Sequence, residues 1–375
     1  MVKKKTKEKQ IDPRIKKLAK VLVDYSIAVK CRGLIIPKKG DAVKISSSVL
    51  AKDLILEIYR LVLKKGMYPS VNVGLPGMSK IYYENASDEQ LKHFPKMAMY
   101  ETKRTQAYIG IDAPKDTRDL AHINPKKLAM REKVTHKLSD YIVNEQTKIR
   151  RVSTDFPTKA LAKDAGMSLK EFEDLLYGAT NIDWNKEKKR LYKIEKLFHG
   201  GKEVRIVGKN TDITLGIKGR KFVIDAGEEN MPGGEMFCAP LETKTNGKIL
   251  FTYPSIRDGR KISGIYLEFK DGQVVKAKAS QNEDYLKEML KIKGAKIVGE
   301  LGIGCNTRVK RYTNDLLFDE KIGGTIHLAL GMSYKECKGT NGDAAIHWDI
   351  VKDLRKGGTM YVDGKVIQKN GKWIF

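Results

Sequence analysis

Alternating apolar and polar residues predict a strand, a helix and a second strand early in the chain. Residues 40–46 (GDAVKIS) alternate in character, and residues 68–74 (YPSVNVG) form a similar extended run. Between them, residues 47–66 carry apolar side chains at helical spacing before Gly66. The spaced apolar residues are Leu50, Leu54, Ile58 and Leu61. This order predicts a parallel βαβ unit.

The same alternation continues to about residue 200. A helix is expected from Ser87, a strand over 105–111 and a helix over 125–144. Ser168 precedes Glu171 by three positions, which is a capping-box pattern and predicts the start of another helix. The lysine-rich stretch after Trp184 closes on Gly200 and Gly201. We therefore predict an N-terminal α/β domain over residues 1–200.

The second half of the chain is richer in strand patterns. In FKDGQVV and YVDGKVI, Asp-Gly stands between two extended runs, as two-residue hairpin turns prefer. Residues 201–375 are predicted to form a β-rich α+β domain. The fold class is therefore α/β, with this second domain as the expected catalytic and metal-binding part.

Composition bears on location and on partners. Lys plus Arg number 72 against 46 Asp plus Glu, a formal charge of +26, which would attract polyanions such as nucleic acid. The basic residues are spread over the whole chain, which favours instead an ion-pair-rich surface. No apolar run reaches the roughly 20 residues of a membrane span, and the amino end leads into no signal-like segment. The expected location is the cytoplasm. The four cysteines form no CxxC pair, so no thiolate zinc site is predicted.

Candidate chemistry gathers in the second half. His327 and His347 lie in the apolar segments TIHLALG and AAIHWDIV. Asp349 follows His347 by two residues, so in a strand both side chains leave the same face and can share a ligand. A single strand histidine is more often a hydrogen-bonded core residue. The short His-x-Asp pattern therefore indicates a metal site only if further candidate ligands accompany it.

Two acidic residues are such further candidate ligands. Glu235 and Glu300 lie in the glycine-rich, apolar segments NMPGGEMFCAP and KIVGELGIGCN. A buried carboxylate needs a partner, which could be a turn, a lysine or a cation. Imidazole and carboxylate together suit zinc, cobalt, manganese or iron, and a carboxylate-rich set can offset the repulsion between two cations. Gly302 and Gly304 suggest a dinucleotide loop, but Thr307 stands at the third glycine position and argues against it.

The ordered segments NMPGGEMFCAP, GELGIGCN, DEKIGGTIHLALG and IHWDIV resemble the metal-binding blocks of the aminopeptidase T family of dinuclear metallopeptidases, over roughly residues 200–352. The resemblance implies Tyr334 as a site tyrosine that binds either a metal ion or the reacting carbonyl. It implies Glu300 as the bridging ligand, and Glu300 or a neighbouring carboxylate as the group that relays a proton. Glu320 is a further candidate, with a surface carboxylate as the alternative. The implied metal ligands are Glu235, Glu300, Glu320, His327, His347 and Asp349.

The resemblance implies hydrolysis of the first peptide bond of peptides with a free amino terminus. The implied cofactors are two divalent ions, zinc, cobalt or manganese, and the expected assembly is a homodimer. One alternative is a ring-cleaving dioxygenase on a related fold, with a single Fe(II) on His327, His347 and Asp349. Another is a non-catalytic nucleic-acid-binding protein, whose affinity would fall steeply with salt and ignore chelators.

Overall fold

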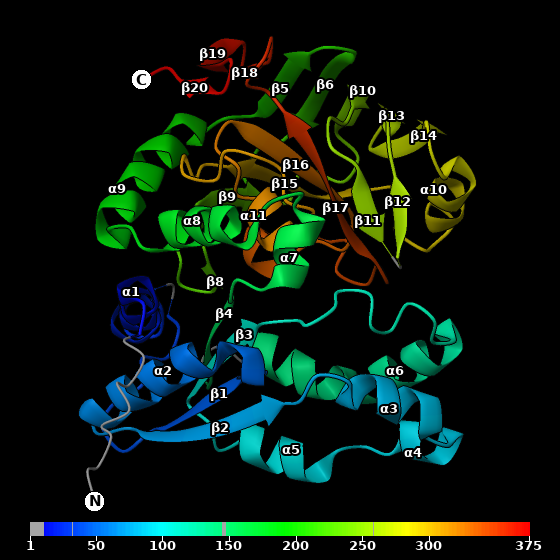
Figure 1. Cartoon of the computed structure of the whole chain (residues 1–375). Coiled ribbons are helices and arrows are strands. Elements are labelled where there is room, and N and C mark those ends of the chain that lie inside the picture. The colour runs from blue at the N-terminus through cyan, green and yellow to red at the C-terminus, as the bar shows by residue number, and fades with distance from the viewer. Residues whose placement is uncertain (1–10, 32, 145–147, 258) are drawn as a thin grey trace, which may run out of the picture. The chain divides into compact units, whose positions relative to one another are not determined.

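The computed structural model describes residues 11–31, 33–144, 148–257 and 259–375. The chain divides into two compact units (Figure 1). The first contains the chain up to Ala162 and Ser168–Asn181, and the second contains Lys163–Met167 and Ile182–Phe375. The amino end for which no signal segment is predicted, residues 1–10, lies outside the described residues.

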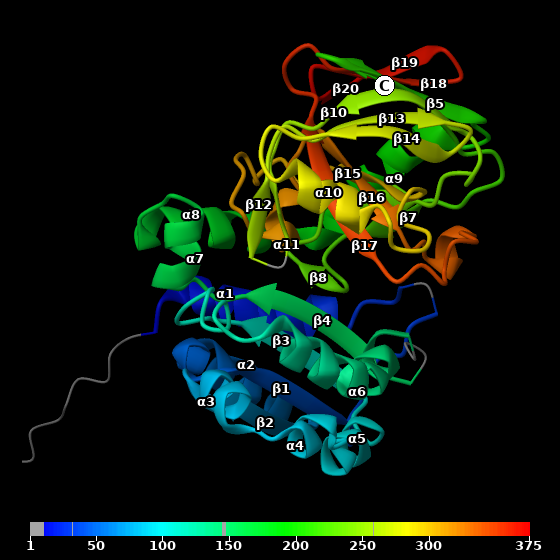
Figure 2. The same ribbon diagram turned by 90° about the vertical axis from the view of Figure 1, so that its right-hand side faces the viewer.

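A parallel sheet organises the first unit. Strands β1 (Ala42–Ser48), β2 (Tyr68–Gly74), β3 (Ala107–Asp112) and β4 (Arg150–Asp155) pair in the order β2-β1-β3-β4. All three pairings are parallel, which confirms the predicted βαβ arrangement. Figure 2 shows these strands with the helices of the unit around them.

The helices of the first unit include the four predicted ones together with others that were not predicted. They are α1 (Pro13–Val21), a π-helix (Leu22–Ser26), a 3-10 turn (Val49–Ala51), α2 (Lys52–Lys64), α3 (Met78–Asn85), α4 (Asp88–Lys92), α5 (Lys96–Thr102), α6 (Pro125–Asn144), α7 (Lys159–Asp164, at the junction) and α8 (Leu169–Thr180). The four predicted helices are α2, α4, α6 and α8. Ser168 caps α8 through the predicted reciprocal bonds with Glu171.

The buried face of α2 differs in part from the predicted one. Leu54 and Ile58 are buried as expected, but Leu50 is 41% exposed. Leu50 lies in the 3-10 turn before α2, where the helical phase is not yet established. Ile55 and Val62 complete the buried stripe instead.

Antiparallel sheets dominate the second unit. An eight-stranded sheet has the order β14-β13-β10-β6-β5-β18-β19-β20, and a five-stranded sheet has the order β17-β16-β15-β9-β7. The strands are β5 (Glu203–Gly208), β6 (Thr211–Gly216), β7 (Val223–Asp225), β8 (Asn230–Met231), β9 (Glu235–Cys238), β10 (Thr245–Leu250), β11 (Ser255–Arg257), β12 (Arg260–Ile262), β13 (Tyr266–Lys270), β14 (Gln273–Lys278), β15 (Val298–Gly304), β16 (Thr325–Gly331), β17 (His347–Asp353), β18 (Thr359–Val362), β19 (Lys365–Lys369) and β20 (Lys372–Trp373). The helical segments are α9 (Trp184–Glu195), α10 (Glu283–Met289), α11 (Leu316–Asp319) and 3-10 turns at Lys196–Phe198 and Lys335–Cys337.

Both predicted Asp-Gly turns join neighbouring strands of the larger sheet. Asp271 and Gly272 connect β13 to β14, and Asp363 and Gly364 connect β18 to β19. All four residues have positive φ, as a type I′ turn requires. The parallel sheet and the antiparallel sheets together confirm the predicted mixed α/β fold. Within the described part of the chain, no helix combines the length and the apolar character needed to cross a bilayer.

Candidate metal centre

The five-stranded sheet places the strongest ligand candidates on one face. Gly302 of β15 pairs with His327 of β16, and Ala329 pairs with both Glu300 and Asp349. Because directly paired residues point to the same side and side chains alternate along each strand, these positions share a face. The residues brought together on it are Glu235, Glu300, His327, His347 and Asp349.

Glycine makes room for the imidazole at the centre of this face. A Cβ atom on Gly302 would lie 1.8 Å from Nε2 of His327, so no larger residue fits there without moving the ring. Gly302 and Gly304 both lie inside β15, an antiparallel strand, rather than in a turn that leads into a helix. Gly302 therefore makes room for the His327 ring, and neither glycine lies in the strand-to-helix turn that holds a dinucleotide phosphate.

Ligand atoms converge around Glu300. Nε2 of His327 lies 3.0 Å from one Glu300 carboxylate oxygen, and Nε2 of His347 lies 3.8 Å from the other. His347 Nε2 is also 3.4 Å from Oδ2 of Asp349. One ligand atom each from Glu300, His327 and Asp349 lie within 4.8 Å of one another, and all three residues are buried. This group has the size and chemistry of a metal site.

The two histidines are oriented differently. His347 Nδ1 lies 2.8 Å from the backbone oxygen of Met332 and donates to it when it carries the proton. Nε2 of His347 then presents its lone pair to Glu300 and Asp349, an arrangement common in metal-binding histidines. His327 has no described hydrogen-bond partner for Nδ1, so its contacts run through Nε2.

Two buried oxygens of the cluster lack a hydrogen bond among the described residues. These atoms are Oδ1 of Asp349 and Oε2 of Glu235, which lies 3.7 Å from His327 Nε2. A buried polar atom without a partner costs free energy, and a cation is one way to supply the partner. The donor set therefore fits a bound metal ion.

Titration behaviour reflects the same crowding of acidic groups. Burial raises the pKa of Glu235 to about 7 and that of Asp349 to about 6. Burial opposes the charge of His327, but its bond to Glu300 and the nearby carboxylates outweigh burial and raise its pKa to about 10. In the absence of a metal ion, Glu235, His327 and Asp349 therefore take up protons at a higher pH than these groups ordinarily do.

Lys321 is a residue of the cluster that the sequence patterns did not single out. Its side chain is fully buried, and Nζ donates to Oε1 of Glu235 at 2.7 Å and to Oε2 of Glu320 at 2.9 Å. Burial disfavours the ammonium, but Glu235 and Glu320 outweigh it and hold the pKa of Lys321 well above its usual value. The Glu320 side chain is 17% exposed and pairs with Lys321.

Tyr334 lies at the edge of the cluster. Its ring centroid is 5.3 Å from that of His347 and 5.8 Å from that of Phe237. Phe237 and Tyr334 pack against a small buried group that includes Cys337. The structure thus places the predicted site tyrosine beside a candidate ligand.

The cysteines near the candidate ligands are buried, as expected for small apolar residues. Burial raises the pKa of the Cys305 thiol to about 12 and raises that of Cys238 well above its usual range. Neither sulfur belongs to the group of convergent ligand atoms. Among the described residues, the candidate centre therefore offers nitrogen and oxygen ligands.

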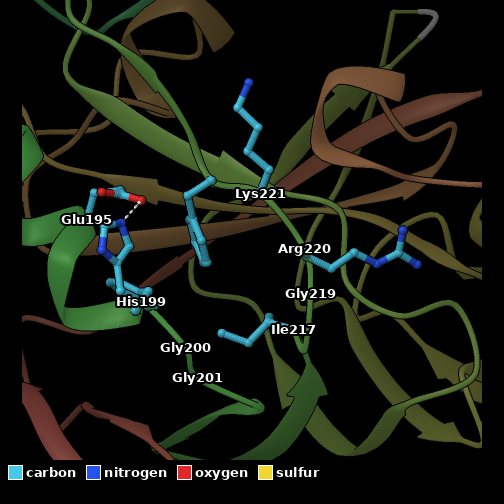
Figure 3. A pocket seen from close by; sticks show the side chains of 10 residues that line it. Glu195, His199, Gly200, Gly201, Ile217, Gly219, Arg220 and Lys221 are labelled. Atoms are coloured by element: carbon cyan, nitrogen blue, oxygen red, sulfur yellow. Dashed lines mark hydrogen bonds and ion pairs between the residues drawn. The ribbon is translucent and has the colours of Figure 1, made fainter.

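A separate pocket of about 320 Å³ lies in the second unit (Figure 3). It is lined by residues around His199, Gly201 and Arg220, and His199 Nε2 pairs with Glu195 at 2.6 Å. None of the predicted metal ligands lines this pocket. The convergent chemistry lies instead on the five-stranded sheet.

Two solved structures share this fold. Wild-type AmpT from Thermus thermophilus aligns with a TM-score of 0.81 at 18% identity, covering 97% of this chain and 99% of that chain. The 2,5-dihydroxypyridine dioxygenase from Pseudomonas putida KT2440 aligns with a TM-score of 0.58 at 11% identity, covering 96% of each. At these identities the likeness shows a shared fold alone.

Sequence comparison identifies curated relatives and a family. Aminopeptidase 2 of Geobacillus stearothermophilus is 26% identical over 80% of this chain and 84% of its own length. Aminopeptidase AmpS of Bacillus subtilis (strain 168) is 25% identical over 90% of this chain and 95% of its own length. The thermophilic metalloprotease (M29) family matches residues 11–373. This chain therefore belongs to the thermophilic metalloprotease (M29) family.

Proposed function

We propose that this protein is a metal-dependent aminopeptidase that removes the first residue of peptides. The buried group of Glu300, His327 and Asp349, whose ligand atoms lie within 4.8 Å of one another, carries the proposal. Membership of a metalloprotease family and two relatives named as aminopeptidases support it. We propose that Glu300, His327, His347 and Asp349 hold the catalytic metal.

Nitrogen and oxygen ligands suit zinc, cobalt or manganese. When bound, such an ion would polarise the scissile carbonyl and lower the pKa of water. Glu300 is our candidate for accepting the proton of the attacking water and returning it to the leaving amine, because its carboxylate is buried among the other ligands. Tyr334, beside His347, is our candidate for donating to the developing oxyanion.

Recognition of the free amino terminus requires an acidic acceptor. Oε2 of Glu235 is buried, lacks a described hydrogen-bond partner and lies 3.7 Å from His327 Nε2. We propose that this oxygen accepts a hydrogen bond from the peptide's amino group, which would restrict cleavage to the first bond. The resemblance also supports a cytoplasmic homodimer, which we retain as part of the proposal.

The activity test uses metal-stripped protein reloaded with zinc, cobalt or manganese. We expect cleavage of peptides with a free amino terminus and none of the same peptides after acetylation. A parallel sample loaded with Fe(II) and given 2,5-dihydroxypyridine tests the dioxygenase alternative. Cleavage of only the blocked peptide, or of neither with any metal, would rule out the proposed function.

The role of Glu300 has its own test. Glu300→Gln keeps the shape of the side chain but removes its charge and its ability to carry a proton, so we expect turnover to fall by about 10²–10⁴-fold. Glu288→Gln, at a position whose side chain is 64% exposed and pairs with Lys291, is the matched control and should retain full activity. Near-normal turnover by Glu300→Gln with unchanged folding would remove Glu300 from the mechanism.

A further inference from the structure

Lys321 occupies the place between two of the six predicted metal ligands. It follows α11, and its ammonium contacts Oε1 of Glu235 and Oε2 of Glu320 at hydrogen-bond distance. The side chain is 0% exposed, so no water competes for these contacts from the protein surface. Glu235 and Glu320 therefore already share a cation, which belongs to the chain itself.

The remaining candidate ligands lie on the other side of Glu235. Glu300, His327 and Asp349 form the convergent group, and His347 adjoins it through Glu300 and Asp349. Glu235 faces both places, because Oε1 binds Lys321 and Oε2 lies 3.7 Å from His327 Nε2. The cluster thus divides into a place that holds an internal ammonium and a place where Asp349 Oδ1 has no hydrogen bond among the described residues.

We propose that the Lys321 ammonium replaces the second metal ion, so that each chain binds one divalent cation on Glu300, His327, His347 and Asp349. This inference rests on the metal site of the proposed function. A second ion on Glu235 and Glu320 would have to displace the ammonium or lie within a few ångströms of it. Positive charges at that distance in a buried site repel strongly, and the ion would also lose its hydration shell.

The arrangement gives Lys321 a defined part in the site. By holding Oε1 of Glu235, it fixes the carboxylate with Oε2 directed toward His327. By offsetting part of the charge of Glu235 and Glu320, it weakens the attraction that these carboxylates would otherwise exert on a second cation. Lys321 is therefore a positioning residue.

The test counts bound ions in the full-length protein. Metal-free wild-type protein is titrated with zinc, and stoichiometry is measured by native mass spectrometry and calorimetry. We expect one tightly bound ion per wild-type chain. In Lys321→Met the two carboxylates lose their internal cation, so we expect a second ion to bind at least about tenfold more tightly than any second ion in the wild type.

Lys352→Met is the matched control. Lys352 is another buried lysine of the second unit, but its Nζ donates to the backbone oxygens of Lys209 and Leu250 rather than to a carboxylate. This variant should keep the wild-type stoichiometry. Lys321→Gln provides a second, polar replacement, and circular dichroism verifies that each variant is folded.

The number of ions bound per wild-type chain can by itself contradict the inference, whatever the variants bind. Two ions of comparable affinity per wild-type chain would contradict it, and with peptide cleavage intact the proposed function would still stand. One ion per chain without cleavage of any free peptide would leave the inference standing and contradict the function. No bound ion would contradict both.

Discussion

At the residue scale, the site depends on the smallest side chain as much as on the ligands. Gly302 provides the space in which the His327 ring lies, and its place in the ladder directly opposite His327 explains why. Buried ligands in a sheet compete for volume with their cross-strand neighbours. Removing that space should therefore affect metal binding before it affects the fold.

We predict that Gly302→Ala weakens zinc binding by about 10–100-fold, the range typical of residues that orient a metal ligand. The added methyl group would displace the His327 ring, since the Cβ position is 1.8 Å from Nε2. Competition with a chromophoric chelator measures the affinity. Gly178→Ala, at a glycine with no atom near its Cβ position, should bind zinc like the wild type.

A second residue-scale prediction concerns Asp353, at the end of β17. Asp353 accepts hydrogen bonds from Arg355 at 2.6 Å and from the Tyr253 hydroxyl at 2.8 Å. Burial opposes its ionisation, but Arg355 and Tyr253 outweigh burial, and its pKa lies below the ordinary value. A lowered folded pKa stabilises the protein above the unfolded pKa of about 4, and this stability is lost as the pH falls through the folded pKa.

Asp353→Asn should therefore lower the free energy of unfolding by about 1–2 kcal/mol at pH 7. The difference from the wild type should stay constant down to about pH 5 and shrink below about pH 4. Urea unfolding followed at several pH values measures it. A difference that instead grew on acidification would mean that the carboxylate is not stabilised by its neighbours.

At the element scale, two Asp-Gly hairpins share a turn type but not their surroundings. Gly272 and Gly364 have φ of 84° and 80°. A Cβ on Gly272 would lie 1.8 Å from the backbone oxygen of Glu242, whereas a Cβ on Gly364 would meet nothing within 4 Å. Comparing the same substitution at Gly272 and at Gly364 therefore distinguishes the cost of backbone strain from the cost of a steric contact.

We predict that Gly364→Ala costs about 1 kcal/mol, the strain of an L-residue in the left-handed region. Gly272→Ala should cost clearly more, because the turn at Glu242 that precedes β10 must also move. The difference between their free energies of unfolding, measured by urea titration, isolates the contact with Glu242. Equal losses would show that the neighbouring backbone yields freely.

At the scale of the whole molecule, the proposed metal ligands all belong to the second unit. Strands β9, β15, β16 and β17 must all be paired before these side chains converge. Metal should therefore stabilise this unit selectively. All three tryptophans, Trp184, Trp348 and Trp373, lie in it, so their fluorescence reports on it separately from the first unit.

Zinc at about 100 times its dissociation constant should add about 2.7 kcal/mol to the stability of the second unit. We expect its thermal midpoint, followed by tryptophan fluorescence, to rise by about 5–10 °C. Glu300→Gln should reduce the rise in thermal midpoint that zinc produces. An equal shift of the first unit, followed by its contribution to circular dichroism, would argue against a site confined to the second unit.

The sequence by itself determined the features that arise from nearby residues. The Ser168 capping box, the Asp-Gly hairpins and the parallel βαβ unit were predicted and confirmed, because capping, turn geometry and side-chain alternation act over a few positions. The common face of His347 and Asp349 followed from the same alternation. The family resemblance, confirmed by the metalloprotease match, supplied the order of the other candidate ligands.

Only the tertiary structure decided which of these groups contact one another. Lys321 and Glu235 are 86 residues apart, and no local pattern predicts that pairing. Gly302 lies opposite His327 because of the register between β15 and β16, which depends on how the whole sheet pairs. Candidate ligands can be identified along the chain. The number of cations that they bind depends on the distances between their side chains and Lys321, which are set only when the unit has folded.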